Sequence, residues 1–192
     1  AAVDNEAEYD DITTIMAIKE ALESYNCRVT LLEVDKELPV KLVEHKPDII
    51  FNIAEGIHGR GREAQVPALL NFYKIPYTGS DETTLCIALD KALTKRILST
   101  YHIKTPKDRV IAKDQSQLTG RFPFPAIVKP NAEGSSKGIS DVAIVTNRRE
   151  LQELVSKDIG LYKQDMLVEE YISGREFTVG IFGNGSDVHV FP

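Results

Sequence analysis

FPAIVKPNAEGSSKGISDVAIVT, residues 124–146, places a loop rich in glycine and serine between two apolar runs. The runs, 126–129 and 141–146, are rich in β-branched residues and predict two strands. The loop between them, 131–140, is called the glycine loop below; it lacks the spacing of a Walker-type phosphate loop and of a dinucleotide-binding fingerprint. Its backbone N–H groups are little obstructed by side chains, and such groups can form a nest for an anion. The candidate anion-binding residues are Gly134, Ser135, Ser136 and Gly138. A polar hairpin loop without a ligand is the open alternative.

Two lysines favour the anion-binding interpretation. Lys129 ends the first apolar run directly before the glycine loop, where a buried charge without a partner would be costly. Lys91 lies near the start of a helix expected over 89–103, where the helix dipole disfavours a cation unless an anion is close. A phosphate held by the loop would supply the negative partner for both. Each lysine also has an ordinary interpretation, as a side chain whose charged end reaches solvent.

The first half of the chain alternates between helical and strand patterns. Helices are expected over 10–26, 39–46 and 62–74, and strands over 28–34, 48–53 and 75–80. This alternation predicts an α/β domain with a parallel sheet covered by helices on both faces, which we assign to residues 1–82. Such folds usually begin with a strand, so we expect a first strand upstream of residue 1.

The second half has a different pattern, in which strands follow one another closely. Helices are expected over 89–103 and 147–158, and strands over 108–112, 126–129, 141–146, 166–172 and 176–183. This order is typical of an α+β domain with antiparallel hairpins. We place the boundary between the two halves near residues 80–88. Because the last residues resemble the interior of a strand-rich region, we expect the chain to be part of a longer protein.

The composition argues against several classes of function. The 192 residues carry a net charge of −6, without a basic cluster interleaved with aromatics, so a nucleic-acid partner is not expected. No apolar run reaches the roughly 20 residues that cross a bilayer, and no signal peptide is evident. We therefore expect no membrane association and a cytoplasmic location. No catalytic triad and no zinc-binding spacing is evident either, so neither a catalytic nor a metal-ligating residue is predicted within this chain.

Two further segments carry polar groups that suit a small ligand. In LVEEYISGREFTV, residues 167–179, the backbone up to Ile172 offers hydrogen bonds to a purine edge, and Glu176 offers acceptors for ribose hydroxyls. The polar segment 52–65 follows an expected buried strand and contains His58. Ligands of parallel sheets bind beyond the carboxyl ends of the strands, which makes this segment a candidate for substrate binding. A solvated hairpin and a surface loop are the open alternatives for the two segments.

Four motifs in this order carry a family resemblance: IPYTGS, LDKALTKRIL, FPAIVKPNAEGSSKGIS and LVEEYISGREFTV. Together they resemble the ATP-grasp ligases and, among these, the D-alanine–D-alanine ligases. The resemblance implies an N-terminal Rossmann-like (pre-ATP-grasp) domain, a central ATP-grasp domain and a larger C-terminal domain, with ATP between the last two. It assigns residues 1–82 to the first domain, 83–174 to the second and 175–192 to the beginning of the third. It also implies that ATP and Mg²⁺ support the joining of two D-alanines through an acylphosphate, for peptidoglycan synthesis.

The resemblance implies a role for each matched residue. Lys91 and Lys129 would contact the phosphates of ATP, and the glycine loop would close over them. Glu169 would accept a hydrogen bond from the adenine amino group, Ile172 would bond the ring through its backbone, and Glu176 would hold the ribose.

The chain departs from the family pattern in two places. His58 and the glycine after it fit the substrate loop of the family, and Glu63 fits its glutamate, but Arg62 and Ala64 replace the residues beside it. We assign His58 to substrate binding. The magnesium ligands of the family are expected beyond residue 192, so the chain alone is expected to be inactive. A related ligase for other amino or hydroxy acids, a nucleotide-binding module without ligase activity, and a homodimer are open alternatives.

Overall fold

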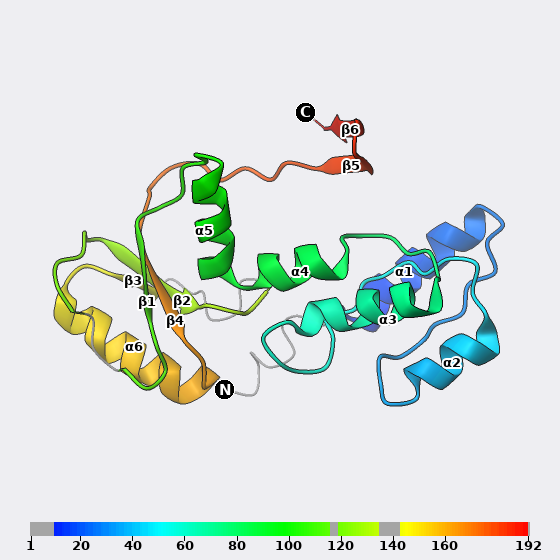
Figure 1. Ribbon diagram of the computed structural model, residues 1–192, viewed down its shortest axis with the longest axis horizontal. Coiled ribbons are helices and arrows are strands. Elements are labelled where there is room, and N and C mark those ends of the chain that lie inside the picture. The colour runs from blue at the N-terminus through cyan, green and yellow to red at the C-terminus, as the bar shows by residue number, and fades with distance from the viewer. Residues whose placement is uncertain (1–9, 116–118, 135–142, 192) are drawn as a thin grey trace.

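The computed structural model describes residues 10–115, 119–134 and 143–191. The helices are α1 (Ile12–Ser24), α2 (Leu38–His45), the 3₁₀ helix η1 (Arg62–Ala64), α3 (Gln65–Tyr73), α4 (Glu82–Leu89), α5 (Lys91–Thr100) and α6 (Arg148–Tyr162). The strands are β1 (Asp108–Ile111), β2 (Ala126–Pro130), β3 (Ile144–Val145), β4 (Met166–Glu170), β5 (Ile181–Asn184) and β6 (Asp187–Val190). Figure 1 shows α1, α2 and α3 at one end of the molecule and the β1–β4 sheet with α6 at the other, with α4 between them.

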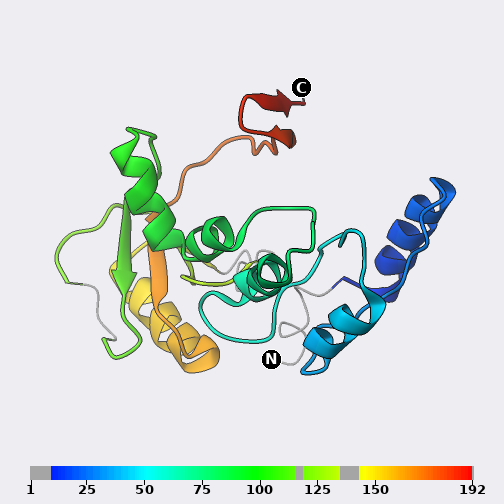
Figure 2. The ribbon, with the colours of Figure 1, turned by 45° about the vertical axis from the view of Figure 1, so that its right-hand side comes forward.

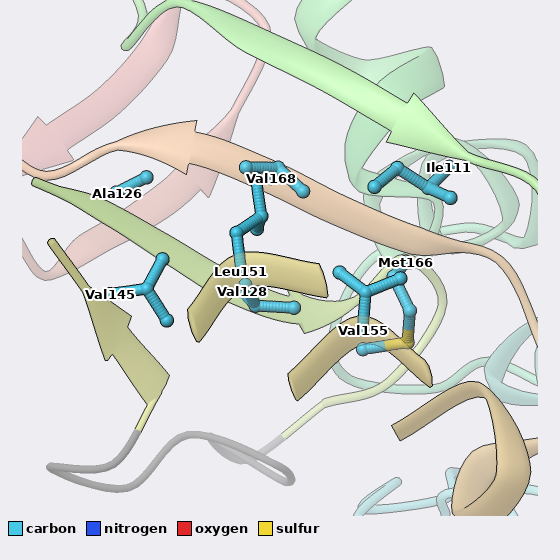
Figure 3. Packing of buried hydrophobic residues seen from close by; sticks show 8 residues of the cluster. All are labelled: Ile111, Ala126, Val128, Val145, Leu151, Val155, Met166 and Val168. Carbon is cyan, nitrogen blue, oxygen red and sulfur yellow. The ribbon is translucent and has the colours of Figure 1, made fainter. Parts of the chain in front are cut away.

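The second half of the chain folds around a four-stranded antiparallel sheet with the strand order β1-β4-β2-β3. The central strand β4 pairs with both β1 and β2, so that Val168 lies opposite Arg109 and Val128. Helix α6 covers one face, where Leu151 and Val155 pack against the apolar residues of the strands (Figure 3). This arrangement confirms the predicted α+β organisation.

Local sequence signals set the start of α6. The side chain of Asn147 accepts a hydrogen bond from the backbone N–H of Glu150 at 3.1 Å, and the Glu150 carboxylate accepts one from the backbone N–H of Thr146 at 2.8 Å. The first bond satisfies an N–H group that the first helical turn leaves open, and the second joins the residue before the cap to the helix. The helix continues past the expected end at residue 158 because Ile159 and Tyr162 still pack against the core.

Successive strand residues point to opposite faces of a sheet, and here the two faces differ in chemistry. Ala126, Val128 and Val168 contribute to the apolar core beneath α6. Alternation places Lys129 and Glu169 on the opposite face, and Asp108 shares that face because it is the register partner of Glu169. Helix α5 lies over this second face (Figures 1 and 2). We call the face formed by Asp108, Lys129 and Glu169 the charged face.

The first half of the chain departs from the predicted parallel sheet. Segments 48–53 and 75–80 meet at a single parallel bridge, Ile50–Tyr77, closed by backbone hydrogen bonds of 2.8 and 2.9 Å. The prediction of a strand over 28–34 is wrong. Leu32 and Val34 pack against the core formed by α2 and α3, but no backbone hydrogen bond among the described residues joins this segment to a neighbouring strand. A strand needs a partner for its N–H and C=O groups, which an apolar pattern alone does not supply.

Two aspartates cap the helices that follow residue 80, α4 and α5, at their N-termini. Asp81 caps α4 by accepting from the backbone N–H of Thr84 at 2.7 Å, and Asp90 caps α5 by accepting from that of Leu93 at 3.0 Å. The sequence predicts one helix over 89–103 and leaves the residues of α4 unassigned. The extended backbone of Asp90 (φ −84°, ψ 95°) ends α4 and starts α5 in a new direction.

The last described residues form a hairpin of β5 and β6 that stands apart from the four-stranded sheet (Figure 2). All residues of 171–191 are exposed. The strand expected over 176–183 begins only at Ile181, where β6 supplies hydrogen-bond partners. The preceding residues, 176–180, lie outside any strand.

Candidate functional site

A carboxylate between two lysines lies on the charged face. Glu169 Oε1 accepts a hydrogen bond from Lys95 Nζ at 2.5 Å, and Glu169 Oε2 pairs with Lys129 Nζ. Lys95 Nζ also donates to the carbonyl oxygen of Pro106 at 2.6 Å and lies 3.5 Å from a carboxylate oxygen of Asp108. The side chains of Lys95 and Glu169 are 9% and 8% exposed, whereas that of Lys129 is 20% exposed. Lys95 is therefore enclosed by the fold, and Lys129 lies closer to solvent.

The surroundings of Glu169 keep it ionised. Burial raises the pKa of this carboxyl, but hydrogen bonds and charges from Lys129 and Lys95 outweigh burial and leave the pKa below its ordinary value. An ionised carboxylate only accepts hydrogen bonds, and its two oxygens together offer about four acceptor sites. The two lysines use one site on each oxygen, so Glu169 can also accept from an N–H group of a ligand.

Lys91 lies against the beginning of the glycine loop. Its Nζ donates to the carbonyl oxygen of Glu133, and its backbone N–H donates to the carbonyl oxygen of Asn131 at 3.0 Å. The Asn131 side chain in turn donates to Asp90 Oδ1 at 2.8 Å and accepts from a backbone N–H in the first turn of α5 at 3.0 Å. These bonds attach the start of α5 to the chain that leaves β2. Lys91 and Lys129 therefore lie close to the same stretch of backbone, 129–134.

Glu133 also receives a side chain from the 52–65 segment. Arg62 Nη2 lies 3.2 Å from Glu133 Oε2, and Arg62 Nη1 donates to the carbonyl oxygen of Ala132 at 3.2 Å. Gln164 Nε2 donates to the other carboxylate oxygen of Glu133 at 2.5 Å. The side chains of Arg62 and Glu133 are 11% and 13% exposed, so this ion pair is largely removed from water.

A second ion pair joins the same two parts of the chain. Arg60 Nη2 lies 2.6 Å from Asp90 Oδ2, although the Arg60 side chain is 72% exposed. Burial raises the pKa of Asp90, but hydrogen bonds from the Leu93 backbone and the Asn131 side chain, together with Arg60, leave the pKa below its ordinary value. The 52–65 segment is thus tied to the N-terminus of α5 and to the start of the glycine loop.

The structure brings some predicted site residues together and leaves others apart. Those near the end of β2 are Lys91, Lys129, Gly134 and Glu169. Those outside the described residues are Ser135, Ser136 and Gly138. Ile172 and Glu176 are exposed on the segment between β4 and β5, and His58 is exposed on the 52–65 segment, where its carbonyl oxygen accepts from Gln65 Nε2 at 2.8 Å. The ligand contacts assigned to these three residues stay predictions.

Lys95 and Arg62 belong to this site although the sequence did not predict them as site residues. Lys95 lies four residues after Lys91, on the same face of α5, which is a spacing signal. The buried residues of this helix are Ala92 and Lys95, so a charged side chain lies on its inward face. The spacing of residues around Arg62 does not point to a site. In the sequence, Arg62 stands out only because it replaces the residue that the family pattern has at this position.

No three His, Cys, Asp or Glu side chains among residues 10–115, 119–134 and 143–191 are grouped as metal ligands. In the same ranges, no helix has the length and apolar character needed to cross a membrane.

Known proteins similar to this chain include several D-alanine–D-alanine ligases. Residues 98–192 match the family model for the D-ala D-ala ligase C-terminus. The chain is 41% identical over 172 residues to the D-alanine–D-alanine ligase of Aquifex aeolicus, covering 88% of this chain and 57% of that protein. It is 36% identical over 171 residues to the D-alanine–D-alanine ligase of Zymomonas mobilis, covering 87% of this chain and 51% of that protein. The crystal structure of the D-alanine–D-alanine ligase from Bacillus anthracis matches with a TM-score of 0.60 at 28% identity, covering 76% of this chain and 47% of that one. The chain spans about half the length of the curated relatives that it matches.

Proposed function

Since this chain belongs to the family of D-alanine–D-alanine ligases, we propose that it supplies the N-terminal and central parts of an enzyme that uses ATP to form D-alanyl-D-alanine for peptidoglycan precursors. The observation that carries the proposal is the convergence of two lysines on the start of the glycine loop. Lys91 contacts the carbonyl oxygen of Glu133, and Lys129 lies near the end of β2 and pairs with the ionised carboxylate of Glu169.

ATP would bind with its phosphates near the two lysines and its base near Glu169. Lys91 and Lys129 supply positive charge, and the glycine loop supplies backbone N–H groups, which together favour a polyphosphate. Glu169 can accept a hydrogen bond from the amino group of adenine. The proposed contacts of Ile172 with the ring and of Glu176 with the ribose complete the site; both residues lie on the segment between β4 and β5.

The reaction would proceed in two steps. A carboxylate oxygen of the first D-alanine attacks the γ-phosphorus of ATP, the bond to the β-phosphate oxygen breaks, and ADP leaves. The amine of the second D-alanine then attacks the carbonyl carbon of the acylphosphate, inorganic phosphate leaves, and the nitrogen loses a proton. Lys91 and Lys129 would stabilise the negative charge that gathers on the transferred phosphoryl group, a contribution that depends on prior positioning.

We assign the substrate side of the site to the first part of the chain. Residues 1–82 would form a Rossmann-like domain, residues 83–174 the central ATP-grasp domain, and residues 175–192 the start of the C-terminal one. The parallel bridge between Ile50 and Tyr77 supports the first assignment, because it places two predicted strands side by side in the expected direction. His58 follows the first of these strands and would contact the amino-acid substrate.

A related ligase with a different substrate is the second candidate. Arg62 stands where the resemblance leads us to expect another residue, and its guanidinium is engaged by Ala132 and Glu133. A largely buried arginine on the segment assigned to the substrate would change the shape and charge of that segment. This observation favours keeping other amino acids and hydroxy acids as candidate substrates.

Three parts of the proposal rest on the family alone. The Mg²⁺ ion that the family implies has no grouped ligands among the described residues, so we derive no step through it. A cytoplasmic location follows from the proposed use of ATP. A homodimer stays a prediction, which the sedimentation velocity of the intact protein tests.

The nucleotide site is tested by ATP-dependent thermal stabilisation of the intact protein. Replacing Lys129 by alanine should abolish the shift in melting temperature that ATP produces, because the phosphates lose a positive partner. Each variant is compared with its own melting temperature without ATP, since Lys129 also pairs with Glu169. Lys157→Ala, at an exposed position of α6, should leave the shift unchanged. An unchanged shift in Lys129→Ala would contradict the assigned phosphate contact.

The substrate is tested by phosphate release from ATP. We expect release to require D-alanine and to be absent with L-alanine or D-lactate alone. Release that depends on another amino acid or on a hydroxy acid, and not on D-alanine, would select the second candidate. If the protein binds ATP but releases no phosphate with D-alanine, another amino acid or a hydroxy acid, it would be a nucleotide-binding module without ligase activity.

A further inference from the structure

Lys95 has a set of contacts that differs from those of the two lysines assigned to the phosphates. Its Nζ reaches Glu169, the carbonyl oxygen of Pro106 and, at 3.5 Å, the carboxylate of Asp108. The side chain is 9% exposed, and these groups hold its ammonium on the charged face. A buried ammonium group is tolerated only when it is paired and hydrogen-bonded, which this set of partners achieves.

The two lysines around Glu169 differ in their freedom. Lys129 Nζ is bonded to Glu169 Oε2, and its side chain is more exposed than that of Lys95. If Lys129 turns towards a phosphate, as the proposed function requires, Glu169 loses one of its two cationic partners. Lys95 stays in place because the Pro106 carbonyl and the β1 carboxylate also hold it. Lys95 is therefore the partner that can keep Glu169 ionised in the occupied site.

We propose that Lys95 is a positioning residue that holds Glu169 as a permanent hydrogen-bond acceptor and so makes the site prefer a 6-amino purine over a 6-oxo purine. This inference rests on the proposed function, in which Glu169 meets the base of the nucleotide. An ionised carboxylate accepts from the amino group of adenine and repels the carbonyl oxygen of hypoxanthine. A protonated carboxyl could instead donate to that oxygen, and the preference would weaken.

The test compares ATP with ITP, which carries a 6-oxo group in place of the 6-amino group. In Lys95→Met the ammonium group is lost while the length of the side chain is largely kept. We expect the ratio of kcat/KM for ATP to that for ITP, measured in the intact protein, to fall about tenfold or more, mainly through KM. Lys95→Arg should restore most of the ratio, because the guanidinium is always charged. Arg96→Met, at an exposed position of the same helix, should leave the ratio unchanged.

A pH profile separates this role from a purely structural one. The charged groups that face Glu169 are Lys95 from α5, Lys129 from β2 and Asp108 from β1. Loss of Lys95 leaves burial and Asp108 opposed by Lys129 alone, so protonation of Glu169 becomes easier. The acidic limb of kcat/KM for ATP should therefore move to higher pH in Lys95→Met and return in Lys95→Arg.

Each outcome has a definite meaning. Equal losses for ATP and ITP in a folded Lys95→Met protein, with an unchanged pH profile, would overturn the inference. If Lys95→Met does not fold, Lys95→Gln keeps a hydrogen-bond donor without the charge, and an undiminished preference for ATP in that variant would overturn it as well. A wild-type protein that binds neither nucleotide would contradict the proposed function itself. Binding of both nucleotides with no preference would contradict only the role of Glu169 and Lys95.

Discussion

Removal of the Arg62–Glu133 ion pair should destabilise the chain more than removal of any exposed pair. The two side chains are 11% and 13% exposed, and the closest nitrogen and oxygen are 3.2 Å apart. With an effective dielectric constant of about 20, this separation corresponds to an attraction of about 5 kcal/mol, most of which desolvation of the two groups offsets. Arg62→Ala removes a largely buried cationic partner of Glu133 and should lower the free energy of unfolding by about 3 kcal/mol. The pairwise coupling should be about 2 kcal/mol, as for hydrogen bonds to charged groups.

A double-mutant cycle isolates this coupling from the other contacts of Arg62. The free energy of unfolding is measured by urea denaturation for the wild type, Arg62→Ala, Glu133→Gln and the double variant. The Arg149–Glu153 pair is a matched control, since it joins the same residue types at 2.9 Å but with side chains 88% and 64% exposed. Its coupling should be much smaller, because both side chains are solvated and water screens their attraction. A coupling for Arg62–Glu133 no larger than that of the control would refute the reasoning.

Three further predictions concern single positions. The pKa of Glu169 is lowered from 4.5, so its ionised form stabilises the fold above about pH 4.5, and this contribution is lost as pH falls further. The urea midpoint of unfolding should therefore decrease less on acidification in Glu169→Gln than in the wild type. Burial raises the pKa of Asp158 above 3.8, so its charged form destabilises the fold at neutral pH. Asp158→Asn should therefore raise the urea midpoint of unfolding at pH 7. A rise of the same size below pH 3 would contradict this explanation. Gly56 has φ +74°, and a Cβ there would lie 2.0 Å from the carbonyl oxygen of Arg62. Gly56→Ala should therefore lower the free energy of unfolding, measured with heat or urea, by about 3 kcal/mol or more. Gly59→Ala should lower it by only about 1–2 kcal/mol, because φ is +98° there but nothing lies within 4 Å of the added Cβ.

The sequence predicted those parts of the fold whose signals are local. Asn147 marks the start of α6, and the apolar runs before and after the glycine loop contain β2 and β3. The segment 28–34 has an equally good strand pattern but forms no strand, because strand formation also depends on a neighbour elsewhere in the chain. The helix α4 was missed because its start depends on a side-chain cap at Asp81, which resembles ordinary loop sequence.

The sequence predicted the site residues that lie within a recognisable motif. It did not predict those that reach the site only through contacts between distant parts of the chain. Lys129 and Glu169 were identified from their motifs, and the antiparallel register of β2 and β4 then places both on one face. Lys95 lies 74 residues from Glu169 in the sequence, and Arg62 lies 71 residues from Glu133, so neither contact has a local signature. Such contacts follow only when the packing of α5 and of the 52–65 segment is known.

The difference between the two faces of the sheet also determines how accurately its strands can pair. A shift of β4 by one residue would turn Glu169 into the apolar core beneath α6 and would bring Val168 against Lys95 and Lys129. The misaligned sheet would thus contain a buried carboxylate without its cations and two cations without their carboxylate, each of which is strongly unfavourable. With apolar residues on both faces, a strand such as Met166–Val168 would discriminate poorly between the two alignments. The residues proposed to recognise a nucleotide therefore also protect the sheet against misfolding.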